Sequence, residues 1–130
     1  MSKLKCFLLT MLGAIVVLAA AAVLVPLFCD YIARAALSES LQQLTLYRDA
    51  IAEHVAKEGS AESSGVEISI PSEAFPSLNV DYARVFPDGT IVIRHAEHHQ
   101  VVIWEPSVTA GQISWRCIGG PEKDVPAACR

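Results

Sequence analysis

The residues best suited to chemistry are three histidines and a glutamate within five positions, namely His95, Glu97, His98 and His99. Imidazole nitrogens held this close together can bind zinc, copper or nickel. The same residues lie at the junction of two predicted strands, where a polar turn is expected in any case. We therefore expect a solvated turn at this point, with no metal site and no cofactor.

Four cysteines form the second group of reactive side chains: Cys6, Cys29, Cys117 and Cys129. The last two lie near the C-terminus, and in an oxidising compartment they most simply pair with each other. A disulfide loop of that size would stabilise the fold by about 3 kcal/mol in the chain-entropy model. Two buried free thiols are the alternative, and zinc is less favoured because no second Cys or His pair lies nearby at zinc-finger spacing. The sequence assigns no role to Cys6 or Cys29.

The sequence contains no recognisable pairing of a nucleophile with a base. The serines of residues 59–65 lie in a linker-like stretch, and Gly119-Gly120-Pro121 lacks the strand–loop–helix context of a phosphate-binding loop. Trp104 and Trp115 fall at strand positions with alternating neighbours, so they are expected in the core rather than in a ligand platform. We therefore expect a protein that is not an enzyme.

Composition and charge narrow the class of protein further. Hydrophobic residues make up 52% of the 130-residue chain and charged residues 18%, whereas globular domains are usually about 45–50% apolar and about 25% charged. The apolar excess lies in residues 6–29, and residues 30–130 carry eight basic and fourteen acidic side chains. This composition argues against a disordered chain and against a multidomain enzyme, and the acidic C-terminal part argues against direct binding of nucleic acid.

The apolar segment of residues 6–29 predicts a membrane-spanning helix. At about 1.5 Å per residue it extends roughly 36 Å, which is enough to span a hydrocarbon core of about 30 Å. Lys3 and Lys5 precede it, so the positive-inside rule places the N-terminus in the cytoplasm and residues 30–130 outside. A cleaved signal peptide is the alternative, but the apolar run continues past the alanines at 19–22 through Phe28.

Residues 30–58 predict an amphipathic helix that continues the membrane segment. No glycine or proline interrupts it before Gly59, a natural C-cap. Pro26 is the one break in the preceding segment, and we expect it to kink the helix rather than end it. One apolar stripe follows the helical repeat: Leu37, Leu41, Leu44, Tyr47, Ile51 and Val55. The result is a single helix of about fifty residues whose second half needs a partner to cover its stripe.

Four strands are predicted after the linker of residues 59–65. They occupy residues 80–86, 90–95, 100–105 and 112–117, with Pro106 ending the third. Their apolar residues alternate as in half-buried antiparallel strands. We therefore expect an α+β fold in which one long helix packs on a four-stranded antiparallel sheet.

Both ends of the chain carry motifs of a known family. The stretch Asp30-Tyr31-Ile32-Ala33-Arg34, together with the preceding Pro26, resembles the segment just after the membrane part of bacterial type IV pilins. The ending Gly111-Gln112-Ile113-Ser114-Trp115-Arg116-Cys117, followed by Val125-Pro126 and Cys129, is similar to the close of the same family's globular head. The order of elements between them also agrees, so the resemblance covers nearly the whole chain.

This resemblance implies a role as well as a fold. Pilins have a kinked spine helix and a four-stranded head, wait in the inner membrane with the head in the periplasm, and polymerise into extracellular fibres that serve adhesion, motility or DNA uptake. It implies a disulfide loop from Cys117 to Cys129 that can contact a surface receptor. The partners it implies are other pilin subunits and the pilus-assembly machinery. The helix residues that it assigns to the assembly interface are Phe7, Leu12, Ile15, Val16, Leu18 and Val23.

The leader departs from the family pattern. In the family the leader ends in glycine followed by phenylalanine, and the fifth residue after the cut is glutamate. Here Cys6 precedes Phe7 and Met11 replaces the glutamate, so these three residues form a degenerate leader-cleavage region. Two hypotheses follow. The chain is a cleaved, methylated structural or accessory subunit of a pilus or secretion fibre, or it is an uncleaved membrane-anchored periplasmic module with a binding or regulatory role that does not polymerise. The expected domains are 1–29, the leader and membrane half, and 30–130, the exported head.

Overall fold

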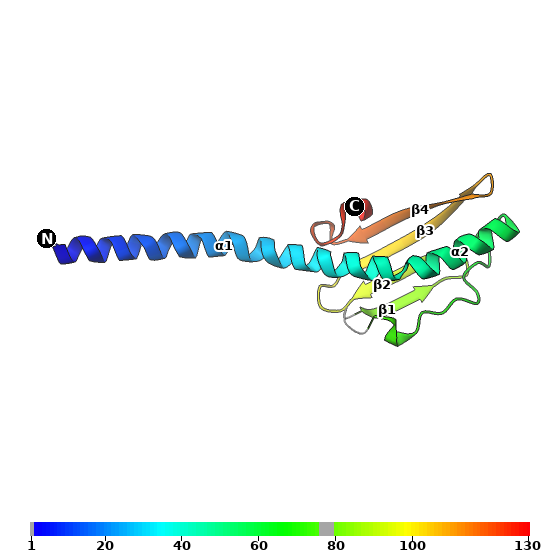
Figure 1. Cartoon of the computed structure of the whole chain (residues 1–130), viewed down its shortest axis with the longest axis horizontal. Helices are drawn as coiled ribbons and strands as arrows, with labels where there is room; N and C mark the ends of the chain where they lie inside the picture. Colours follow the sequence, from blue (N-terminus) through cyan, green and yellow to red (C-terminus); the bar gives the residue numbers. More distant parts are fainter. Residues whose placement is uncertain (1, 76–79) are drawn as a thin grey trace. The chain divides into compact units, whose positions relative to one another are not determined.

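The computed structural model describes residues 2–75 and 80–130. It divides into two compact units, residues 1–32 and 33–130, which we call the helical unit and the head. A first helix, α1 (Ser2–Gln43), supplies the helical unit and the beginning of the head. The head adds a second helix and a sheet, whose elements are shown in Figure 1.

The helical unit is a continuous α-helix through its apolar residues. Pro26 lies inside α1, and helix is assigned on both sides of it, so the proline does not end the helix. The one hydroxyl of residues 6–29 is satisfied locally, because Thr10 Oγ1 donates to the carbonyl oxygens of Phe7 at 2.8 Å and Cys6 at 3.1 Å. Such back-bonding lets a threonine sit in an apolar helix without an unpaired polar group. The kink at Pro26 stays a prediction.

The helix expected over residues 30–58 is confirmed, with one irregular residue. Leu44 separates α1 from α2 (Thr45–Glu58), but its φ of −72° and ψ of −9° keep the helical path. Its N–H donates to Ser40 O at 3.2 Å, and its own carbonyl accepts from the N–H groups of Tyr47 and Arg48. Gly59 caps α2 at φ +72°, with its N–H donating to Val55 O, as the sequence predicted.

The head contains a four-stranded antiparallel meander in the order β1-β2-β3-β4. The strands are β1 (Val80–Val85), β2 (Ile91–His95), β3 (Val101–Thr109) and β4 (Gln112–Gly120). Three short 3₁₀ helices complete it: η1 (Ser72–Ala74), η2 (Glu122–Asp124) and η3 (Ala127–Cys129). The predicted fold class, one long helix packed on a four-stranded antiparallel sheet, is confirmed.

The predicted end of the third strand at Pro106 is wrong. Strand β3 continues to Thr109, and Pro106 lies opposite Trp115 of β4. The pairing of β3 with β2 ends at Trp104, so beyond that residue β3 has β4 as its neighbour on one side only. A proline is tolerated there because its missing N–H falls where no ladder bond to β2 is needed.

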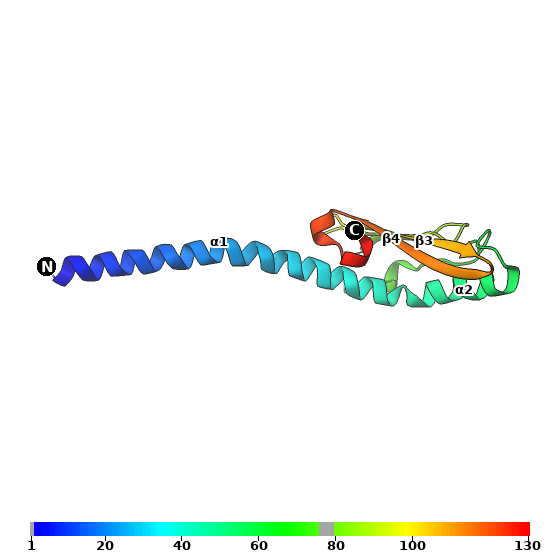
Figure 2. The same cartoon turned by 90° about the horizontal axis from the view of Figure 1, so that it is seen from above.

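The core lies between the helix stripe and one face of the sheet. Leu37, Leu44, Ile51 and Val55 are at most 1% exposed, while Leu41 and Tyr47 pack partly buried against them. Ile91, Ile93 and Val102 cover this stripe from β2 and β3. Figure 2 shows α2 lying along this face of the sheet. Full burial of each such aliphatic side chain contributes about 1.5–3 kcal/mol, so the stripe is the main reason the helix docks on the sheet.

Candidate assembly segment and disulfide loop

The helical unit presents apolar side chains on all sides. The six residues predicted for the assembly interface are 58–69% exposed, and Cys6 and Met11 of the leader region are exposed as well. Within the described residues, one helix, Lys3–Glu58, is long and apolar enough to cross a membrane by length and composition. An apolar surface of this extent is unfavourable in water, so it requires lipid or other apolar helices around it.

The C-terminal cysteines form the disulfide Cys117–Cys129. The two alternatives, free thiols and a zinc site, are therefore wrong. The bond joins β4 to η3 and closes a loop whose inner side is part of the core, since Val125 and Cys129 are at most 1% exposed. Cys6 and Cys29 stay free and exposed.

A buried glutamine ties this loop to the helix. Gln100, which is fully buried before β3, donates through Nε2 to Ala33 O at 3.2 Å and to Asp124 O. Arg34 Nη1 adds a longer bond of 3.4 Å to Lys123 O. The side chain of Gln100 thus joins three segments: the first head residues of α1, the turn before β3 and the disulfide loop. These bonds hold the loop against the helix.

The family model described as Pilin (bacterial filament) matches residues 33–130. The chain belongs to the pilin family. No curated protein and no solved structure matches the chain significantly. Because pilins are structural filament proteins, this chain is a pilin-like filament subunit. The match spans the head and leaves the helical unit outside it.

One histidine of the cluster in the pilin head does not lie where the sequence predicted. His95 is 2% exposed and ends β2 on the core face, next to Ile91 and Ile93 in the alternating pattern. The prediction of a solvated turn is therefore wrong for His95, although His98 is half-buried and His99 is exposed with φ +51°. In β2 the core-facing residues are every second one, and extending this alternation from Ile91 and Ile93 would have placed His95 in the core. No group of three metal-binding side chains occurs among the described residues.

His95 joins the sheet to the helix through a hydrogen bond. Its Nε2 lies 2.9 Å from Ser40 Oγ, and Ser40 Oγ donates its proton to Ala36 O at 3.1 Å. Because that hydroxyl has only one proton, we infer that His95 Nε2 carries the ring hydrogen and donates it to Ser40. Burial, and then the neighbouring His98, lower the pKa of His95, while Glu97 and Asp81 oppose this shift.

The head should therefore lose stability in mild acid. Because the pKa of His95 is lower in the folded head than in the unfolded chain, its contribution to stability is complete above about pH 6.5 and falls as the pH decreases. The slope from one such group is at most about 1.4 kcal/mol per pH unit. Urea unfolding of the full chain in detergent, followed by tryptophan fluorescence, measures it.

His95→Gln removes the titration and should flatten the fall in unfolding free energy between about pH 7.5 and about pH 5. His99→Gln, at an exposed position of the same turn, is the control and should keep it. An equal fall in His95→Gln and in the unmodified chain would show that another group causes the pH dependence.

Both tryptophans of the pilin pack against the core, as predicted. Trp104 and Trp115 meet edge to face with ring centroids 6.4 Å apart, and the Arg48 guanidinium lies 4.2 Å from the centroid of Trp104 and 5.0 Å from that of Trp115. Partial burial lowers the pKa of Arg48, with Asp49 opposing the shift. A cation over two aromatic faces holds α2 against β3 and β4.

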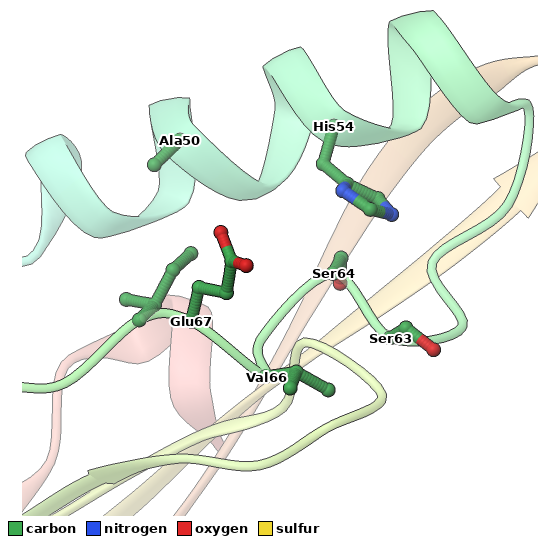
Figure 3. A pocket seen from close by; sticks show the side chains of 7 residues that line it. Ala50, His54, Ser63, Ser64, Val66 and Glu67 are labelled. Carbon is green, nitrogen blue, oxygen red and sulfur yellow. The ribbon is translucent and has the colours of Figure 1, made fainter.

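A pocket of about 420 Å³ with both polar and apolar lining residues lies between α2 and the loop that follows it. Figure 3 shows His54 and Glu67 reaching into this space from opposite sides, with Ser63 and Ser64 beside them. The hydroxyl of Ser64 is buried without a hydrogen-bond partner among the described residues. The sequence interpretation of these serines as linker missed this pocket, because its lining comes from segments that no local periodicity connects.

Proposed function

We propose that this pilin is a structural or accessory subunit of a type IV pilus or of a related secretion fibre, with roles in adhesion, motility or DNA uptake. One observation carries the proposal. A head matched by the pilin family model follows directly, through α1, from a helical segment that is apolar on every side. Such a segment serves two environments, lipid before assembly and neighbouring helices afterwards.

The residues proposed to make the fibre contacts are the apolar side chains of the helical unit. We propose Phe7, Leu12, Ile15, Val16, Leu18 and Val23 as the assembly interface, and other pilin subunits and the assembly machinery as the partners. Lys3 and Lys5 favour a cytoplasmic N-terminus in the inner membrane, with residues 30–130 in the periplasm. The disulfide loop is the proposed contact for a surface receptor.

The leader region supports a second candidate. Cys6 stands beside the expected cut, where a small glycine is usual, and Met11 replaces the carboxylate that would pair with a neighbour's N-terminal amine. A chain that is not cut before Phe7 would stay in the inner membrane as an anchored module that binds or regulates other pilins. The absence of a carboxylate in the apolar segment also removes an electrostatic device for setting subunit register.

Shearing cells and measuring the intact mass of the chain in each fraction distinguishes the two candidates. The proposal predicts that the chain is released with the filaments, begins at Phe7 and carries a methylated N-terminus. A chain that begins at Met1 and stays in the membrane fraction would support the anchored module instead. Cys6→Gly, which restores the usual residue before the cut, is the matched variant and should increase the processed fraction.

A further inference from the structure

The outer face of the sheet carries a short apolar row. The cross-strand register places Val92, Ile103 and Ile118 in one row across β2, β3 and β4, on the face opposite the core residue Val102. These three side chains are only half-buried. They lie outside the core cluster and its packing neighbours as far as the structure describes the head.

The sequence of β3 explains why this face is unusual. Val101-Val102-Ile103-Trp104 is a continuous apolar run, which is typical of a strand covered on both sides. A strand with one solvated face alternates apolar and polar residues instead. Among the described residues of the head, α1 and α2 pack on the inner face (Figure 2), so the apolar run in β3 points to a second covering partner.

Arginines surround this apolar row. Arg84 lies beside Val92 in the register, Arg94 follows Val92 by two positions, and Arg116 precedes Ile118 by two. All three are exposed, in a chain of net charge −4. Asp81 binds Arg94 at 2.7 Å, and Glu105 lies opposite Arg116, so this face carries a small positive excess. We call Val92, Ile103, Ile118 and these arginines the outer sheet face.

The helix of the same chain presents the complementary surface. Leu46 is 78% exposed, the most exposed of the large apolar side chains described. Glu39, Asp49 and Glu53 are exposed at positions −7, +3 and +7 from Leu46, so they share its side of the helix. Glu53 also binds Lys57 at 2.7 Å. We call Glu39, Leu46, Asp49 and Glu53 the acidic helix face.

We propose that the outer sheet face of one chain binds the acidic helix face of a second copy. Leu46 would cover the apolar row, and the flanking carboxylates would meet the flanking arginines. The spacings agree: Arg94 and Arg116 stand about 7 Å from the row along the strands, whereas Asp49 and Glu39 stand about 4.5 and 10.5 Å from Leu46 along the helix. The side chain of an arginine bridges such differences of a few ångströms.

This contact is heterologous, since it joins two different surfaces of the same chain. A bound pair therefore leaves one outer sheet face and one acidic helix face open, and copies can add in a row. The second copy's helix would cover the outer face as the chain's own helix covers the inner one. The contact requires self-association of heads but not a filament, so it stands apart from the proposed function.

Photo-cross-linking in cells tests the contact with the full chain. A photo-reactive amino acid at Ile103 should give an adduct of twice the chain mass, with the second attachment near Leu46. The same probe at Gln112, an exposed residue at the far end of β4, is the control and should give little adduct. Leu46→Glu should reduce the Ile103 adduct about tenfold, as expected when a central apolar contact is lost.

Charge reversal tests the pairing itself. Arg94→Glu together with Arg116→Glu should reduce the adduct, and adding Glu39→Arg and Asp49→Arg should restore it. Formation of the Cys117–Cys129 disulfide reports that each variant folds. An absent adduct, an attachment elsewhere or a loss without restoration would overturn the inference. Filaments without the adduct would overturn this contact and leave the proposed function intact. The adduct without filaments would support this contact and count against the proposed function.

Discussion

Replacing Gly65 by alanine is expected to lower the free energy of unfolding of the head by about 3 kcal/mol, near the upper end of the usual cost of overpacking. Gly65 is buried where two backbone segments meet, and its N–H donates to Pro87 O at 3.1 Å. A Cβ at this position would overlap the carbonyl oxygen of Phe86 and lie 2.8 Å from Cγ1 of Val85. A backbone oxygen cannot rotate away as a side chain can, so the loop and β1 must separate.

Urea unfolding of the full chain in detergent measures this effect through the two tryptophans, both of which lie in the head. Gly120→Ala is the matched control, because a Cβ there has no described atom within 4 Å. Its unfolding free energy should stay within about 0.5 kcal/mol of the unmodified chain. Equal stability of the two variants would mean that Gly65 and Phe86 are not in close contact.

Removing the disulfide is expected to cost about 3 kcal/mol in the head. The two cysteines are separated by 12 positions, and the chain-entropy model assigns about that value to a loop of this length. The double variant Cys117→Ser and Cys129→Ser also places one hydroxyl in the core cluster and one against it, which adds to the loss. The same unfolding measurement should therefore show a clearly lower midpoint.

The chain offers its own control for the loss of cysteine. Cys6→Ser and Cys29→Ser change two exposed free thiols, so the stability of the head should be nearly unchanged. If the unmodified chain under reducing conditions kept its full stability, the disulfide would make no contribution to the fold. If only the serine variant were unstable, burial of the hydroxyls would be the cause.

Much of the fold could be predicted from the sequence because its signals are local. The stripe from Leu37 to Val55 follows the helical repeat, and four of its six members are fully buried. Gly59 ended the helix where expected. The predictions that failed depend on neighbours far along the chain. Pro106 stays in β3 because β2 has already ended, and the buried His95 has its hydrogen-bond partner in Ser40, fifty-five positions earlier.

Some functional surfaces were likewise predictable from local sequence, and others depend on residues far apart in the chain. The apolar run of residues 6–29 and the cysteine pair near the C-terminus are visible in the sequence. The link from Gln100 to Ala33 and Asp124 could not be predicted, since a glutamine before a strand has no periodic signature and its partners lie in two other segments. The outer sheet face was equally hidden, because only the register aligns Val92 with Ile103 and Ile118.

The claim that this pilin is a fibre subunit is tested most directly by the intact mass of the chain in sheared surface filaments. The account predicts that the chain is found in the filament fraction, that its mass corresponds to a methylated N-terminus at Phe7, and that it retains the disulfide Cys117–Cys129. Recovery of the chain in the membrane fraction alone, with its N-terminus intact at Met1, would contradict the account.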